Sequence, residues 1–217
     1  RQLVELSWQH QGEQVRVELA LDSGTVRTQE HSEEICEVEL ELREGQPDAL
    51  LHLALELANE FALMPCDISK AERGYRLLQP DSYELKIEQA ELSPDSSIDE
   101  ALAQLALQLL ASSQRLAEQY RHSAQWKLLE QWIYGLIQLR GLLSSMGQVV
   151  PRKSSHQLRL MLDELLETWL PYYQAAEQQG SRAQAVEVFA QELDQLRSGQ
   201  FSLQLALWLH QQTWKQP

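Results

Sequence analysis

Carboxylates recur at every second position in two segments of the N-terminal third of the chain. Glu37, Glu39 and Glu41 alternate with apolar residues in one segment, and Glu18 and Asp22 share a parity in the other. A period of two places such side chains on one face of a β-strand. Mg²⁺ prefers carboxylate oxygens, and a cation would relieve the repulsion among these like charges. The alternation is compatible with a metal site, but it is also typical of an antiparallel sheet with one face in water, which the pattern alone favours.

Cations stand near these carboxylates in two places. Arg16 lies beside Glu18 on the expected strand, and residues 69–75 include Lys70 and Arg73. Lysine and arginine side chains bind phosphate oxygens through charge-assisted hydrogen bonds. Taken alone, residues 69–75 are better explained as an ordinary charged loop. The chain has no glycine-rich phosphate loop, nucleophile elbow or cysteine–histidine arrangement, and its six histidines show no spacing typical of metal ligands.

The N-terminal part is predicted to contain strands followed by a helix. Apolar residues alternate with polar ones from Gln14 to Asp22 and again from 35 to 42, which indicates two strands. A third, shorter strand is expected over 3–8, with turns at 10–13 and 22–24. A helix should begin near Pro47, bury a stripe that ends with Phe61, and stop before Pro65.

The C-terminal part is predicted to be an all-helical bundle. Residues 79–97 form an expected connector in which 83–88 could pair as a strand, and Ser97 with Glu100 has the spacing of a capping box. Helices are then expected over 98–120, over 125–146 with a stop at Gly147, after Pro151 with a kink or break at Pro171, after a Ser181–Gln184 cap, and over 201–214.

Composition narrows the function classes. The 217 residues have a net charge of −14, and residues 1–97 hold 8 Lys and Arg against 21 Asp and Glu. General binding to a nucleic-acid backbone is therefore not expected, because that affinity comes from clustered cations. No apolar run reaches the roughly 18 residues of a membrane span, so no membrane partner is expected. Two cysteines fit a reducing compartment, which predicts a cytoplasmic protein.

Three segments in order resemble one known family. Residues 17–24, 35–45 and 69–75 are similar to the CYTH superfamily, the triphosphate tunnel metalloenzymes. The resemblance is strongest to bacterial inorganic triphosphatases, in which a CYTH domain precedes a helical CHAD domain. It covers residues 1–78, and the helical part resembles a CHAD domain more weakly. It reverses the preference for a merely solvated carboxylate face, because the family uses these two strands.

The resemblance implies a fold and a set of site residues. The fold class is α+β, with an antiparallel β tunnel or half-barrel and a packed helix, followed by an all-α helical bundle. The domains expected are 1–78 for the C-terminal half of CYTH, 79–97 for the connector and 98–217 for the CHAD-like bundle. Mg²⁺ or Mn²⁺ would be bound by Glu37, Glu39, Glu41, Asp22 and Glu18, and a triphosphate or polyphosphate by Lys70, Arg73, Arg1 and the neighbouring Arg16. No catalytic residue is assigned.

The chain departs from the family in two places. The Glu-x-Glu-x-Lys signature of the family's first strand does not precede Leu3, and residues 84–88 only mimic its composition. We therefore expect the first half of the CYTH domain to be absent, the remaining sheet to be open and curved, and the chain alone to have little activity. The CHAD-like part has residues 126–129 where the family has a His-x-x-Arg motif, and only Arg140 remains near a later basic cluster.

These observations favour a metal-dependent triphosphatase that hydrolyses inorganic triphosphate in the intact protein. Two alternatives stay open. One is a CHAD-type module that binds polyphosphate or a protein beside an inactive tunnel. The other is an adenylate cyclase of the same superfamily, because substrates that share a triphosphate are not separated by this sequence.

Overall fold

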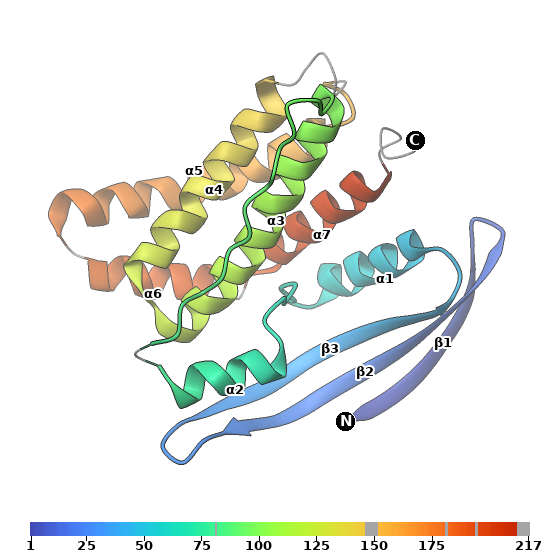
Figure 1. Cartoon of the computed structure of the whole chain (residues 1–217), viewed down its shortest axis with the longest axis horizontal. Helices are drawn as coiled ribbons and strands as arrows, with labels where there is room; N and C mark the ends of the chain where they lie inside the picture. The colour runs from blue at the N-terminus through green and yellow to red at the C-terminus, as the bar shows by residue number, and fades with distance from the viewer. Residues whose placement is uncertain (81, 146–151, 181, 194, 212–217) are drawn as a thin grey trace. The chain divides into compact units, whose positions relative to one another are not determined.

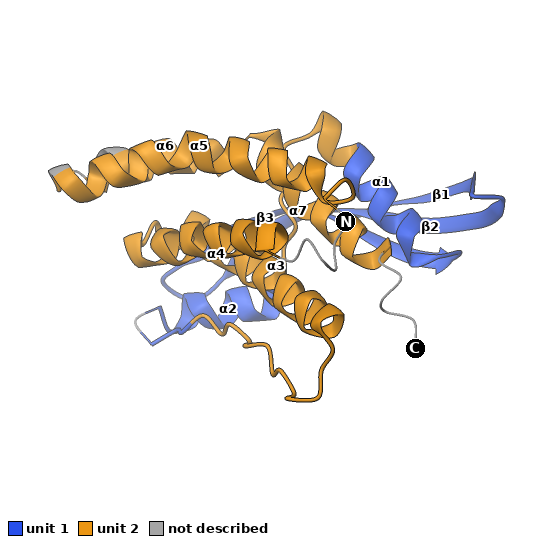
Figure 2. Ribbon diagram, turned by 90° about the horizontal axis from the view of Figure 1, so that it is seen from above, with its two compact units in different colours: residues 1–56, 68–84 blue, residues 57–67, 85–217 orange. Residues whose placement is uncertain are grey.

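The computed structural model describes the whole chain apart from residues 81, 146–151, 181, 194 and 212–217. It has an α+β layout, in which a three-stranded antiparallel sheet is followed by helices, as the sequence predicted. The chain divides into two compact units (Figure 2). The sheet unit contains residues 1–56 and 68–84, and the helical unit contains 57–67 and 85–217.

The sheet has the simplest antiparallel order, with each strand beside the next one in sequence (Figure 1). Its strands are β1 (Gln2–His10), β2 (Glu13–Arg27) and β3 (Ser32–Glu44). A two-residue turn joins β1 to β2, and both turn residues, Gln11 and Gly12, have positive φ angles. Turns of this kind match the twist of the strands that they connect. The three predicted strands are confirmed, and each is longer than its sequence pattern indicated.

The predicted turn at residues 22–24 is wrong. β2 continues through this segment to Arg27, with Asp22 opposite Glu37 and Gly24 opposite Ile35. The chain reverses instead at residues 28–31, where the Thr28 amide donates to the His31 carbonyl at 2.9 Å. Asp-Ser-Gly favours turns locally, but pairing with β3 satisfies the backbone of the longer strand.

Helix α1 (Pro47–Glu60) covers the apolar face at one end of the sheet. Ala49 is fully buried against Val15 and Val17, which are 1% exposed, and further apolar side chains pack around them. This confirms the predicted helix. Phe61, expected to complete its buried stripe, follows the helix and is 60% exposed.

A second helix, α2 (Lys70–Leu78), replaces the charged loop expected at residues 69–75. The Ser69 hydroxyl caps it by accepting a hydrogen bond from the Glu72 amide at 3.1 Å. Gly74 lies against β2, because a methyl group there would meet Val26 at 3.7 Å. α2 therefore packs on the even-numbered residues of β2, and α1 on the odd-numbered ones.

The helical unit forms around one continuous apolar core. Its elements are α3 (Ile98–Ser123), α4 (Trp126–Ser145), α5 (His156–Gln179), α6 (Arg182–Leu193) and α7 (Leu196–Gln211). The Ser97–Glu100 capping box is confirmed. The core includes Leu102, Leu116, Tyr120, Leu129, Trp132, Leu136, Leu162, Trp169, Phe189 and Leu205. Among the described residues, no helix combines the length and apolarity that crossing a membrane requires.

Two further sequence predictions for this unit are corrected. Of the kink or break expected at Pro171, the break is wrong: α5 continues through the proline, and Trp169 and Tyr173 on either side of it are both buried in the core. Residues 83–88 do not form a strand. Leu85 and Ile87 pack on the helical core, and the Arg115 guanidinium donates to the Lys86 carbonyl at 2.8 Å.

The remaining predicted helix boundaries lie outside the described residues. These are the stop at Gly147, the start after Pro151, the Ser181 half of a cap and the end at Trp214.

Candidate functional site

The candidate site lies within the sheet unit, where α2 faces the acidic side of β2 and β3. Lys70, Arg73 and Arg76 are spaced three residues apart, so they follow one side of α2. Asp22 on β2 lies directly opposite Glu37 on β3. The helix thus brings a row of cations to a row of carboxylates.

Lys70 joins three of these carboxylates. Its Nζ lies 2.5 Å from Asp22 Oδ2, 2.7 Å from Glu37 Oε1 and 2.6 Å from Glu39 Oε1. Hydrogen bonds to Asp22, Glu37 and Glu39 raise the pKa of Lys70 above its usual range, so the ammonium stays charged at neutral pH.

Arg1, the residue before β1, approaches the same carboxylates. Its Nε and Nη2 donate to the two oxygens of Asp22 at 2.7 and 2.5 Å, and Nη2 also contacts Glu39 Oε2 at 2.5 Å. The hydrogen bonds from Arg1 and then Lys70 hold the pKa of Asp22 well below its usual range. The hydrogen bond from Lys70 also lowers the pKa of Glu39. Both carboxylates are therefore ionised throughout the physiological pH range.

Arg73 and Arg76 form the buried end of the site. They are 8% and 2% exposed, which is rare for arginine unless it is paired. Arg73 Nη1 lies 3.2 Å from Glu37 Oε2, and Arg76 binds both oxygens of Glu33 at 2.5 and 3.2 Å. Sequence reasoning missed Arg76 and Glu33. If residues 70–78 are recognised as a helix, the three-residue spacing of Lys70, Arg73 and Arg76 indicates that all three lie on one side of it.

The site is balanced in charge. Four cations and four carboxylates alternate across it, and they are Arg1, Lys70, Arg73 and Arg76 with Asp22, Glu33, Glu37 and Glu39. Exposed ion pairs on a solvated sheet face contribute little to stability. The burial of Arg73 and Arg76 distinguishes this face from one that is only solvated.

The other predicted site residues lie further along the strands. Glu18 and Glu41 face each other across β2 and β3, and Arg43 contacts them at 3.0 and 2.6 Å. The hydrogen bond to Glu18 raises the pKa of Arg43. Arg16 is not brought to either cluster of carboxylates, because it pairs with Glu44 at 3.9 Å and both side chains are half exposed. Arg43 was missed, although it continues the alternation of the β3 carboxylates.

The carboxylates suit a hard divalent cation. Asp22, Glu37 and Glu39 each offer an oxygen, and these oxygens lie within 4.8 Å of one another. Mg²⁺ and Mn²⁺ are bound by such oxygen donors. Lys70 Nζ contacts an oxygen of each of the three, so a cation binding here would take the place of the ammonium. The three carboxylates therefore fit the metal. The Lys70 ammonium would then pair with a different anion.

No model of a known protein family matches the chain. The CYTH and CHAD assignments therefore stay predictions that depend on the quoted sequence segments. The geometry of the sheet unit has to support a functional proposal by itself.

Proposed function

We propose that the α2-facing side of the sheet binds a triphosphate together with Mg²⁺ or Mn²⁺, and that the intact protein hydrolyses inorganic triphosphate there. The observation that carries the proposal is the position of Lys70, whose ammonium contacts Asp22, Glu37 and Glu39. Cations for phosphate oxygens and carboxylates for a metal thus occupy one small area.

An exchange of partners explains how such a balanced site would accept its ligand. A metal–triphosphate complex contains both a cation and an anion. Asp22, Glu37 and Glu39 would take the cation, while Lys70 and Arg1 would turn to the phosphate oxygens. Neither the carboxylates nor the ammonium would lose a charged partner, so the cost of separating the resting ion pairs is offset.

The exposed cations of the site would contact the ligand, and the buried ones would position the carboxylates. The side chains of Lys70 and Arg1 are 36% and 49% exposed, so both are accessible to a ligand. Arg73 and Arg76 are buried, and their ion pairs would position Glu37 and Glu33, respectively. When bound, the divalent cation would polarise phosphoryl oxygens and orient the attacking water. The remaining contribution is positioning and electrostatic stabilisation by Lys70 and Arg1.

We propose further that the three strands are part of a tunnel wall. β1 and β3 are the edges of the sheet among the described residues, so closure needs strands from another segment or another chain. The 217-residue chain alone would then bind the ligand but hydrolyse it slowly. The helical unit would be a divergent CHAD-like bundle with a structural role, because Arg140 is paired with Asp163 at 2.5 Å.

A reducing compartment suits this proposal. Among the described residues, Cys36 and Cys66 are exposed and lie outside any disulfide, and exposed thiols persist in the cytoplasm, where disulfides are rare. We therefore place the protein in the cytoplasm.

The proposal is tested by phosphate release from tripolyphosphate in the presence of Mg²⁺, using the protein expressed from its complete reading frame. Glu39→Gln removes a proposed metal ligand and should lower turnover at least tenfold, as loss of a metal's supporting groups typically does. Glu34→Gln is the matched control, because Glu34 is an exposed residue on the opposite face of the same strand. Near-normal Mg²⁺-dependent turnover in Glu39→Gln would overturn the proposal.

A further inference from the structure

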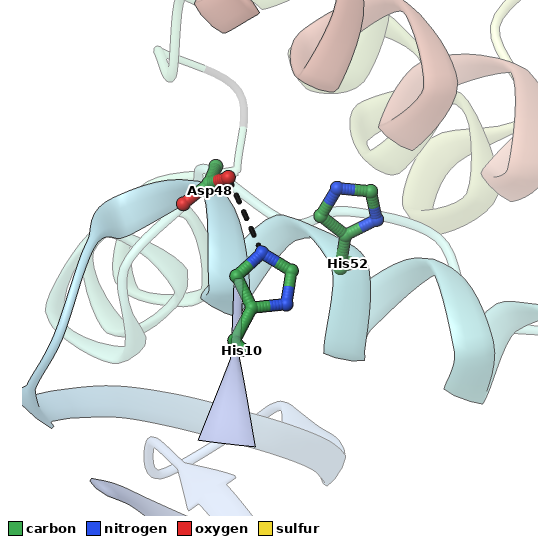
Figure 3. A group of neighbouring side chains, drawn as sticks. All are labelled: His10, Asp48 and His52. Atoms are coloured by element: carbon green, nitrogen blue, oxygen red, sulfur yellow. Dashed lines mark hydrogen bonds and ion pairs between the residues drawn. The ribbon is translucent and has the colours of Figure 1, made fainter. Parts of the chain in front are cut away.

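A second group of potential ligands lies at the other end of the sheet unit. His10 is the last residue of β1, Asp48 is in the first turn of α1, and His52 is one turn further along that helix (Figure 3). One nitrogen or oxygen atom from each of the three lies within 4.8 Å of the others. This group was not predicted from the sequence, because His10 is far from the other two residues along the chain.

Three residues with positive φ angles constrain the backbone around the group. The positive φ angles of Gln11 and Gly12 place His10 at the end of a tight hairpin. Gly45, two residues before α1, has φ +109, and a methyl group added to it would be 2.9 Å from the Val15 side chain. Asp48 and His52 are four residues apart and so lie on the same side of the helix.

The donor atoms suit a borderline transition metal better than Mg²⁺. Two imidazoles and a carboxylate form the ligand set of many zinc sites, whereas Mg²⁺ favours oxygen alone. His10 Nε2 and Asp48 Oδ2 are 3.3 Å apart. Two ligands bound tetrahedrally at about 2.0–2.1 Å from zinc are separated by about 3.3 Å, so this pair already has the required spacing. The His10 and His52 ring centroids are 5.1 Å apart, and one ring nitrogen of His52 lies within 4.8 Å of the other two donor atoms.

The surroundings leave room for a fourth ligand. A cavity of about 100 Å³ borders the group and is lined by His10, Gln11, Glu13 and Asp48 among others. Such a volume accommodates a water molecule. Gln11 Nε2 donates to Asp48 Oδ2 at 3.1 Å, a contact of the kind that orients a ligating carboxylate.

We propose that His10, Asp48 and His52 bind one Zn²⁺ ion, with water from the adjoining cavity as the fourth ligand. The ion would link the β1–β2 hairpin to the start of α1 and stabilise the sheet unit, because a metal that binds only the folded state adds its binding free energy to folding. The proposal is independent of the triphosphate site, which uses other residues and oxygen donors only. A simple hydrogen-bonded contact between Asp48 and its neighbours is the competing explanation.

The test is a zinc titration of the metal-free 217-residue chain in competition with a chromophoric chelator, with excess Mg²⁺ present to occupy oxygen-only sites. We expect one high-affinity Zn²⁺ per chain and a rise in the thermal midpoint of the sheet unit. His52→Gln and Asp48→Asn should each weaken the affinity at least tenfold. His31→Gln, a change at an exposed histidine in the β2–β3 turn, should leave it unchanged.

Two results of the zinc titration would overturn the proposal. One is wild-type affinity no higher than that of His52→Gln, and the other is a high-affinity ion that both ligand variants retain. Cobalt provides a measurement that does not depend on the folding of the variants. Co²⁺ bound to the unaltered chain should develop the visible ligand-field absorption of a nitrogen-ligated tetrahedral ion, and the spectrum of hydrated Co²⁺ would refute the site.

Discussion

Replacing Gly199 with alanine should destabilise the helical unit, although alanine is the better helix former. Gly199 lies in α7 against residues 63 and 64, and an added Cβ would stand 1.7 Å from the Leu63 carbonyl oxygen. Carbon and oxygen that are not bonded normally stay more than 3 Å apart, so the backbone must separate by more than an ångström. Overpacking costs about 1–3 kcal/mol, and a clash with backbone this close belongs in the upper part of that range, above the gain of about 1 kcal/mol in helix propensity.

The assay is thermal unfolding followed by far-ultraviolet circular dichroism, with Gly141→Ala as the matched control. Gly141 is an exposed residue of α4 with nothing within 4 Å of an added methyl group, so its replacement should gain about 0.5–1 kcal/mol. At roughly 2–4 °C per kcal/mol for a chain of this size, the two variants should shift the midpoint in opposite directions. Equal upward shifts would refute the packing of residues 57–67 on α7 and their place in the helical unit.

Two further predictions concern a buried hydrogen bond in the helical unit and the carboxylates of the sheet unit. Ser113→Ala should lower the free energy of unfolding by about 1–3 kcal/mol in urea titrations, because it leaves the buried Trp132 indole, now 2.7 Å from the serine oxygen, without an acceptor. Ser112→Ala should change it little, since that buried hydroxyl makes no hydrogen bond within the described part of the chain, and equal losses in the two variants would contradict the assignment. In acid, the pKa values of Asp22 and Glu39 are lower in the folded chain than in the unfolded one. Their contribution to stability is therefore present above the unfolded pKa values near 4 and is lost as the pH falls through the folded pKa values. The urea midpoint of the sheet unit should therefore decrease when the pH is lowered below 4. The decrease should be less steep in Asp22→Asn, which lacks one of the two carboxylates.

Much of the sheet could be predicted from the sequence, because its signal is local. Val15 and Val17 alternate with polar residues, and the alternation identifies both the strand and its buried face. The same logic placed Glu37 and Glu39 on one side of β3. Register is not local, which is why the sequence predicts a turn at Asp22–Gly24 although this segment pairs with β3.

The parts that sequence reasoning missed depend on contacts between distant segments. α2 has only nine residues and is rich in charge, so its sequence resembles a charged loop, and Arg76 was not recognised as part of the site. Pro171 opposes a helix locally by about 3 kcal/mol, but burial of Trp169 and Tyr173 in the core compensates. The approach of His10 to α1 exists only in three dimensions.

Calorimetric titration of the 217-residue chain with tripolyphosphate in the presence of Mg²⁺ measures whether the sheet face is a phosphate site. Lys70→Gln removes the ammonium that contacts Asp22, Glu37 and Glu39, and Lys127→Gln removes an exposed cation of the helical unit. We predict binding by the unaltered chain, a loss of affinity of about tenfold or more in Lys70→Gln, and no change in Lys127→Gln, since hydrogen bonds to charged groups are the strong ones. Absence of binding by the unaltered chain, or equal affinity in all three proteins, would contradict the proposed site.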